Sequence, residues 1–168
     1  MKPPKGFSVV EVLIVVVFLA IVAALTLPRF SSGSSTARAN TLAENLRVVR
    51  TQLEIFRGQH QGVPPGYPGC DTSKAPIEGA FAKQMIQASD EHGNTAAPGT
   101  PGFRFGLYLQ EIPENPVNGK TTVQVIRDGA AFPNDADDSH GWIYKPETLT
   151  FKADAVGNDD EGRAYFEY

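Results

Sequence analysis

The feature that most constrains this chain is an unbroken apolar run near its amino end. Residues 12–25 are 14 consecutive apolar amino acids, and the 21 residues from Phe7 to Leu27 carry one charged side chain, Glu11. At about 1.5 Å of rise per residue, a helix of this length would be roughly 30 Å long, which matches the hydrocarbon core of a bilayer. The pattern therefore predicts a transmembrane helix over residues 7–28.

The charges that flank this run predict its orientation. Lys2 and Lys5 are the only basic residues before it. Positive residues stay on the cytoplasmic side of a membrane. We therefore expect a single-pass protein with a cytoplasmic amino end and with its globular part across the membrane.

Glu11 is costly in such a segment, and an acid at membrane depth predicts a functional site. Pro3 and Pro4 prevent the helix from extending upstream, and Gly6 leaves an accessible peptide bond before Phe7. Cleavage there would create an α-amine on Phe7, four residues before Glu11. Between neighbouring chains, this amine and the Glu11 carboxylate would neutralise each other in lipid and set the axial stagger of a filament.

The segment Lys5–Ile14, KGFSVVEVLI, resembles the class III signal of type IV pilins and type II secretion pseudopilins. The resemblance implies that a prepilin peptidase cuts after Gly6 and methylates Phe7, and that Glu11 guides assembly into a helical filament. It is specific from Lys5 to Arg29, and beyond Phe30 it is a likeness of architecture only.

Two other interpretations of the amino end stay open. An ordinary secretory signal peptide also has a basic start and an apolar stretch, and Ala20, Ala23 and Ala24 would supply a cleavage site. A simple membrane anchor, with no assembly role for Glu11, is the other. The length of the apolar run and the acid at its head favour the pilin-type signal.

The rest of the chain predicts an α+β fold of the pilin type, a lollipop in which a long helix packs on a small antiparallel sheet. We expect a leader at residues 1–6, the membrane helix at 7–28, its amphipathic continuation at 29–61 and a globular domain at 62–168. An apolar stripe at spacings of four and three marks the continuation: Leu42, Leu46, Val49, Leu53 and Phe56.

Local patterns add detail to this fold. Pro28 and the serine-rich residues 31–35 predict a bend, and Glu54 is placed to pair with Arg50 and Arg57. We expect further elements at residues 77–87 (a helix ending before Gly93), 121–127 (a strand), 141–145 with 149–152 (a hairpin) and 165–168 (a last strand).

Two features favour a pseudopilin over a type IV pilin. Cys70 is the only cysteine, so the chain lacks the disulfide-closed loop that is usual in major pilins. Tyr108-Leu109, Ile112-Pro113 and Asn115-Pro116 are similar to a block before the sheet of the major pseudopilin, although Asn115 and Val117 stand where that family has Asp and Trp.

Charge is mild overall, at −4, and indicates no nucleic-acid partner. Residues 29–57 hold five arginines against two glutamates, whereas residues 128–168 hold ten acids against three bases. A basic stem and an acidic head predict complementary contacts between subunits, although both are equally explained as solvated surfaces.

No enzyme is predicted. His60, His92 and His140 show no metal-ligand spacing, and the sequence lacks the common nucleophile, zincin and phosphate-loop motifs. We expect no cofactor, although two acidic clusters would suit a structural Ca²⁺: Asp135, Asp137 and Asp138, and Asp159, Asp160 and Glu161.

The sequence therefore predicts a structural subunit of a type II secretion pseudopilus in the bacterial inner membrane, with its head in the periplasm. Its expected partners are its own copies, the prepilin peptidase, minor pseudopilins and the inner-membrane assembly platform. A type IV pilin for adhesion, motility or DNA uptake is the first alternative, and a membrane-anchored binding module is the second.

Overall fold

The structure is a computed structural model that describes residues 8–168, apart from the side chains of residues 23–34. It is an α+β fold, as predicted. Two helices, α1 (Val9–Gln59) and α2 (Glu78–Ile86), accompany six short strands in this part of the chain. The strands are β1 (Ala88–Ser89), β2 (Thr95–Ala96), β3 (Phe105–Gly106), β4 (Val123–Val125), β5 (Trp142–Lys145) and β6 (Thr150–Ala153). Three 3-10 turns complete it: η1 (Pro68–Cys70), η2 (Pro146–Thr148) and η3 (Tyr165–Glu167).

The chain divides between Ala37 and Arg38 into two compact units, and α1 contributes to both. We call residues 38–168 the head unit. Residues 28–35 are helical, so α1 is not interrupted after Pro28, and a bend of the helix there stays a prediction. A proline removes one backbone hydrogen bond, and the turns on either side keep theirs.

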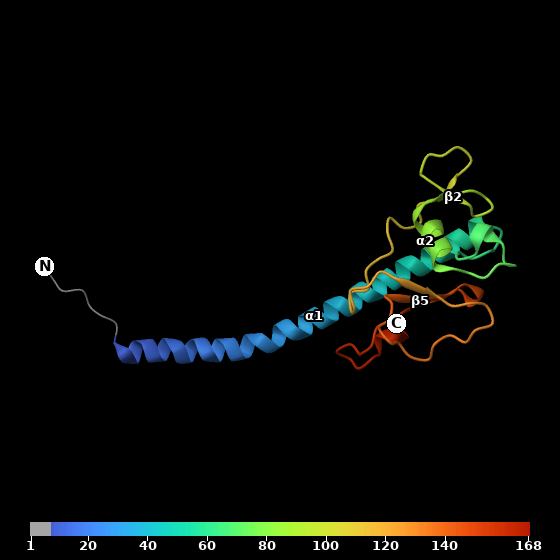
Figure 1. Cartoon of the computed structure of the whole chain (residues 1–168). Coiled ribbons are helices and arrows are strands. Elements are labelled where there is room, and N and C mark those ends of the chain that lie inside the picture. Colours follow the sequence, from blue (N-terminus) through green and yellow to red (C-terminus); the bar gives the residue numbers. More distant parts are fainter. Residues whose placement is uncertain (1–7) are drawn as a thin grey trace. The chain divides into compact units, whose positions relative to one another are not determined.

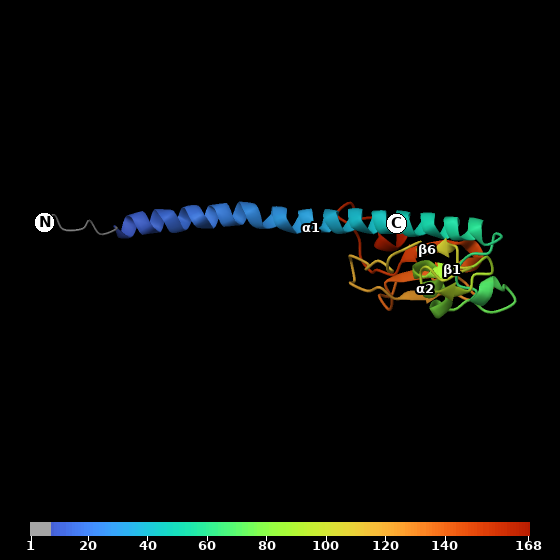
Figure 2. The ribbon, with the colours of Figure 1, turned by 90° about the horizontal axis from the view of Figure 1, so that it is seen from above.

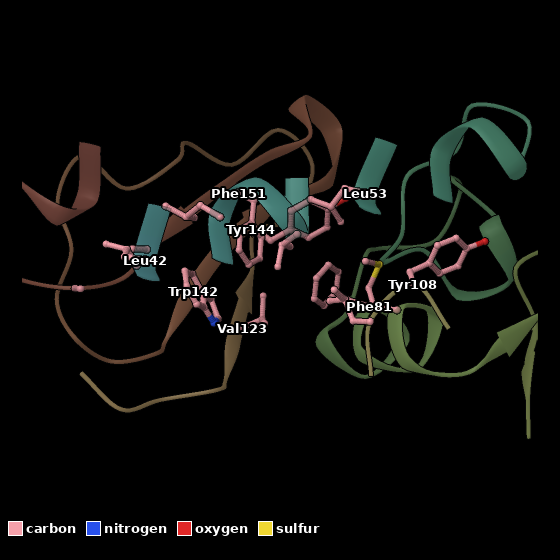
Figure 3. Close-up of a cluster of buried hydrophobic side chains, with 14 of the residues drawn as sticks. Leu42, Leu53, Phe81, Tyr108, Val123, Trp142, Tyr144 and Phe151 are labelled. Carbon is pink, nitrogen blue, oxygen red and sulfur yellow. The ribbon is translucent and has the colours of Figure 1, made fainter. Parts of the chain in front are cut away.

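The core of the head unit is built on the second part of α1. The predicted stripe from Leu42 to Phe56 is confirmed, since each of its five side chains is at most 1% exposed. Figures 1 and 2 show the strands and α2 lying along one side of this part of the helix. Figure 3 shows how Leu42 and Leu53 meet aromatic side chains from β5, β6 and α2: Trp142, Tyr144, Phe151 and Phe81. The Trp142 and Phe151 rings stack with centroids 5.4 Å apart, and Phe81 lies 4.8 Å from Tyr144.

The sheet beside α1 is mixed. β5 and β6 form the predicted antiparallel hairpin, with Trp142 opposite Ala153. β4 confirms the predicted strand, but it runs parallel to β5. The long connection over residues 126–141 carries the chain back along the sheet before β5 begins, so the two strands start at the same end.

Two other elements differ from the prediction. Ala88–Ser89 pairs on both sides with two-residue strands, which makes a small antiparallel sheet in the order β2-β1-β3. Residues 165–168 do not form a strand. Tyr165 and Phe166 lie in η3 and enter two different apolar clusters, which a tight turn allows for neighbouring residues.

The predicted short helix is confirmed as α2, with Phe81 and Met85 fully buried. It ends at Ile86, before the predicted stop at Gly93, which lies in the turn between β1 and β2.

Within the described residues, no helix has the combination of length and hydropathy that a bilayer span requires. Phe7, and the side chains of residues 23–28, lie outside the described part of the chain. The membrane span and the predicted domain boundaries stay predictions.

Candidate assembly sites

Ser8 caps the start of α1 and places Glu11 in its first turn. The Ser8 hydroxyl accepts a hydrogen bond from the N–H of Val10 (3.3 Å), and the Ser8 carbonyl accepts from the N–H groups of Glu11 and Val12. A serine followed three residues later by a glutamate is the sequence of a capping box, and a carboxylate is favoured near the positive end of a helix. Glu11 is exposed. Its charge is therefore tolerated by its own helix and stays accessible to a neighbour.

The surface around Glu11 is apolar and uncovered. Val9, Val10 and Leu13 are each more than 60% exposed, and every large apolar side chain from Val9 to Val22 is at least half exposed. Val9, Val12, Leu13 and Val16 line a shallow groove. Gly6 and Phe7, the predicted processing residues, lie outside the described residues.

Five charged residues of the stem have partners within the chain: Glu44, Arg47, Arg50, Glu54 and Arg57. Glu54 pairs with Arg57 at 3.0 Å, as predicted, and Arg47 pairs with Glu44 at 2.6 Å. Arg50 does not pair with Glu54. Its guanidinium donates to the carbonyl oxygens of Phe151 (2.8 and 3.0 Å) and Tyr168 (2.7 Å), because half-burial against the head brings it to these acceptors. Burial lowers the pKa of Arg50.

The block that resembles the major pseudopilin organises the centre of the head. Asn115 is fully buried; its side-chain amide donates to the carbonyl of Gly141 (2.7 Å) and its side-chain oxygen accepts from the N–H of Val117. Asn118 donates to the carbonyls of His140 (2.8 Å) and Asp154 (2.6 Å). These two asparagines tie residues 112–120 to the sheet. Sequence reasoning did not assign Asn118 a role, although an Asn before a glycine is a recognisable turn signal.

Asp154 holds the first acidic cluster together. Its carboxylate is fully buried and accepts hydrogen bonds from the N–H groups of Asp137 (2.9 Å) and His140 (2.8 Å), and from the Ser139 hydroxyl (3.2 Å). Hydrogen bonds from Ser139 lower the pKa of Asp137. A single acid at the end of a strand carries no pattern that would have predicted this role.

The second acidic cluster is organised by Asp159. Its carboxylate accepts from the N–H groups of Glu161 and Arg163 (both 2.9 Å) and from the Tyr168 hydroxyl. The bond from Tyr168 is the main reason that the pKa of Asp159 is lowered, and the same bond raises the pKa of Tyr168 to about 12. Residues 8–168 contain no group of three His, Cys, Asp or Glu side chains placed to hold a metal. The considered calcium sites stay untested predictions.

His60 and Cys70 are buried or half-buried in the head unit, where they contact other side chains of the fold. His60 is fully buried at the end of α1, stacked on Phe56 at 3.9 Å, with one ring nitrogen donating to the Phe56 carbonyl (2.9 Å). Its other nitrogen lies 3.1 Å from the Ser89 hydroxyl. Cys70 is a half-buried free thiol, and burial raises its pKa to about 11. A thiol with a raised pKa is a poor nucleophile at neutral pH.

Comparison with known proteins points to components of type II secretion systems and type IV pili. The chain is 22% identical over 112 residues to type II secretion system core protein G of Aeromonas hydrophila, across 67% of this chain and 66% of that protein, which is just under two thirds of its length. It is 25% identical over 118 residues to core protein G of Pseudomonas aeruginosa, across 64% of this chain and 82% of that protein.

A further similarity is to the type IV narrow pilus major component PilA5 of Thermus thermophilus, at 28% identity over 93 residues, which cover 55% of this chain and 77% of that protein. No family model and no solved structure matches. The similarities are low in identity but agree with one another. They confirm the resemblance to type IV pilins and type II secretion pseudopilins, and none of these relatives is named as an enzyme.

Proposed function

We propose that this protein is a structural subunit of a type II secretion-type pseudopilus. The observation that carries the proposal is the exposed apolar surface of α1, from Val9 to Val22, with the Glu11 carboxylate exposed in its first turn. Monomeric soluble proteins rarely expose apolar patches of this kind, so this surface has a partner. The bilayer covers it before assembly, and neighbouring helices cover it within the filament.

Processing creates the positive charge that pairs with the Glu11 carboxylate. In this proposal the prepilin peptidase cuts after Gly6 and methylates Phe7, and the new amine of an incoming subunit pairs with Glu11 of its neighbour. Unpaired charge in an apolar environment is expensive, so this pairing selects one axial register. The protein is anchored in the inner membrane with its head in the periplasm, and it assembles with its own copies, minor pseudopilins and the assembly platform.

A type IV pilin is the second candidate. It is favoured by the similarity to PilA5, at 28% identity against 22% and 25% for the core protein G of Aeromonas hydrophila and of Pseudomonas aeruginosa. The two candidates share the filament and differ in what the filament does. A strain without this chain separates the two candidates. It should lose protein export if the chain is a pseudopilin, and adhesion, motility or DNA uptake if the chain is a type IV pilin.

Glu11 tests the filament itself. Glu11→Gln keeps the size of the side chain and removes its charge, so we expect filaments to disappear from electron micrographs while the chain still fractionates with membranes. Ser8→Ala is the matched control, because it removes only the helix cap, at a cost of about 1 kcal/mol, and should leave filaments in place. Normal filaments from the Gln variant would contradict the pairing of amine and carboxylate.

A further inference from the structure

A groove on the head unit is apolar at its floor and acidic at its rim. It has a volume of about 350 Å³ and lies between α2 and the start of β4. Phe81, Ile112 and Val123 form its apolar part, and Glu78 and Glu111 stand beside them. β4 is an edge strand, so no further strand covers this side of the sheet.

Among the described residues, the two glutamates have no ion-pair partner in their own copy. Both are exposed, and neither side chain forms a hydrogen bond or ion pair with another residue of the described chain. Two unpaired carboxylates beside an apolar floor are complementary to a long cationic side chain, since lysine and arginine lay their apolar stems on such surfaces and keep their charge at the rim.

Arg104 is the cation that is placed to reach such a groove in another copy. It is exposed and its side chain has no partner among residues 8–168. It ends the loop over residues 97–104, which Figure 1 shows standing clear of the small sheet after β2. Hydrogen bonds from Thr100 to the Ala97 carbonyl, and from the N–H of Phe103 to the Thr100 carbonyl, hold this loop in shape. A loop that is already ordered loses little entropy on binding.

Two other exposed cations of the head, Lys83 and Arg127, also lack a side-chain partner in the described chain. Lys83 lies on α2 and Arg127 follows β4 by two residues, so both belong to elements that form the groove, although neither side chain lines it. Of the three, only Arg104 lies outside these elements, in the loop before β3.

We propose that Arg104 of one copy docks in this groove of the next, with its stem over Phe81 and Ile112 and its guanidinium between Glu78 and Glu111. The inference rests on the proposed function, and it names the head surfaces that meet in the filament. Arg104 does not line the groove of its own copy. The contact is therefore heterologous: each copy keeps one free groove and one free loop, and repetition produces an open filament.

Disulfide trapping tests the contact without removing its charges. Pro101→Cys beside Arg104, and Thr121→Cys on the groove, are both at exposed positions and are combined in a Cys70→Ser background. Oxidised filaments, sheared from cells that make the full chain, should give a ladder of covalent dimers, trimers and longer species. The control pair, Pro101→Cys with Thr72→Cys, uses another exposed threonine and should trap at least tenfold less. A ladder no stronger than the control would overturn the proposal.

Charge reversal tests whether the charge of Arg104 causes the specific disulfide ladder. Arg104→Glu should weaken the ladder by roughly tenfold, and Glu111→Arg in the same chain should restore most of it. A ladder that is unchanged by Arg104→Glu contradicts the proposal. If instead only the glutamate variants impair export, the groove binds a basic segment of another protein and the proposal is wrong.

The outcomes separate this inference from the function on which it rests. Filaments with no specific ladder would refute the docking of Arg104 and leave the pseudopilin function intact. A wild-type chain that forms no filaments in a host with the assembly machinery would refute the function itself.

Discussion

The two parts of α1 are both rich in apolar residues, yet they have opposite relations to solvent. In the second part, Leu42, Leu53 and Phe56 are 0% exposed, because the sheet and α2 cover one stripe of the helix. In the first part, Phe18 is 68% exposed and Leu19 is 63% exposed. The stripe of the second part alternates with charged side chains, whereas residues 12–22 of the first part are all apolar and exposed.

This difference separates folding from assembly. The buried stripe is satisfied within one copy, so it belongs to the stability of the head. A helix that is apolar all round must be covered by something outside its own copy. Substitutions in the two parts should therefore change different measurements.

The largest expected effect is on the buried stripe. Leu53→Ala should destabilise the head by about 3 kcal/mol, because it leaves a cavity among Tyr144, Phe151 and their neighbours. Leu13→Ala, at a position 62% exposed in the first part, is the matched control and should leave the unfolding of the head unchanged. Thermal unfolding of the full chain in detergent, followed by near-ultraviolet circular dichroism, measures both. Equal losses of head stability from the two variants would contradict the separation of folding from assembly.

A smaller effect is expected at Asp154. Replacement by Ala removes the acceptor of two backbone N–H groups and one hydroxyl, and leaves the N–H groups of Asp137 and His140 without their bonds. We expect a loss of about 2 kcal/mol from the head. Asp135→Ala changes an exposed carboxylate in the same loop and should cost little. Urea titration of both variants is the measurement, and a neutral Asp154→Ala would show that the loop does not depend on this carboxylate.

The smallest effect is a dependence on pH that belongs to the head alone. The pKa of Asp159 lies below its ordinary value of 3.8, chiefly because the Tyr168 hydroxyl donates to it. A lowered pKa in the folded state stabilises the fold above that ordinary value, and the contribution is lost as the pH falls further. Tyr168 gives the opposite limb, since its pKa is raised from 10.0 to about 12 and its contribution is lost as the pH rises through this range.

Melting temperatures recorded across both limbs check this prediction. Asp159→Asn should flatten the acid limb, because it removes the carboxylate to which the Tyr168 hydroxyl donates. An acid limb that is unchanged by Asp159→Asn would show that other carboxylates determine it.

The elements predicted correctly were those with a strong period. The stripe of α1, the helix α2 and strand β6 each bury residues at a spacing that the sequence displays, whereas β5 buries three residues in a row. The two-residue strands β1, β2 and β3 are too short to show any period. The direction of β4 depends on the path of the loop over residues 126–141, which alternation does not record.

The site residues show the same contrast between features that the sequence displays and features that depend on the tertiary fold. Glu11 was visible as a charge in an apolar run, and the structure places it, exposed, in the first turn of α1. Arg50 was expected to pair along the helix, but two carbonyl groups more than a hundred residues away accept its hydrogen bonds. Asp154 was missed for the same reason, because its partners come from a loop that only the tertiary fold brings to it.

The most direct test of the central claim is the mass and amino-terminal sequence of the protein isolated from a membrane fraction. If the first part of α1 is a filament segment, the chain should begin at Phe7 and be one methyl group heavier than its sequence. A chain that begins after Ala23 or Ala24 would contradict the claim, because Glu11 would have been removed with a secretory signal. A chain that keeps Met1 in a host with an active prepilin peptidase would contradict it as well, and would leave α1 as a plain anchor.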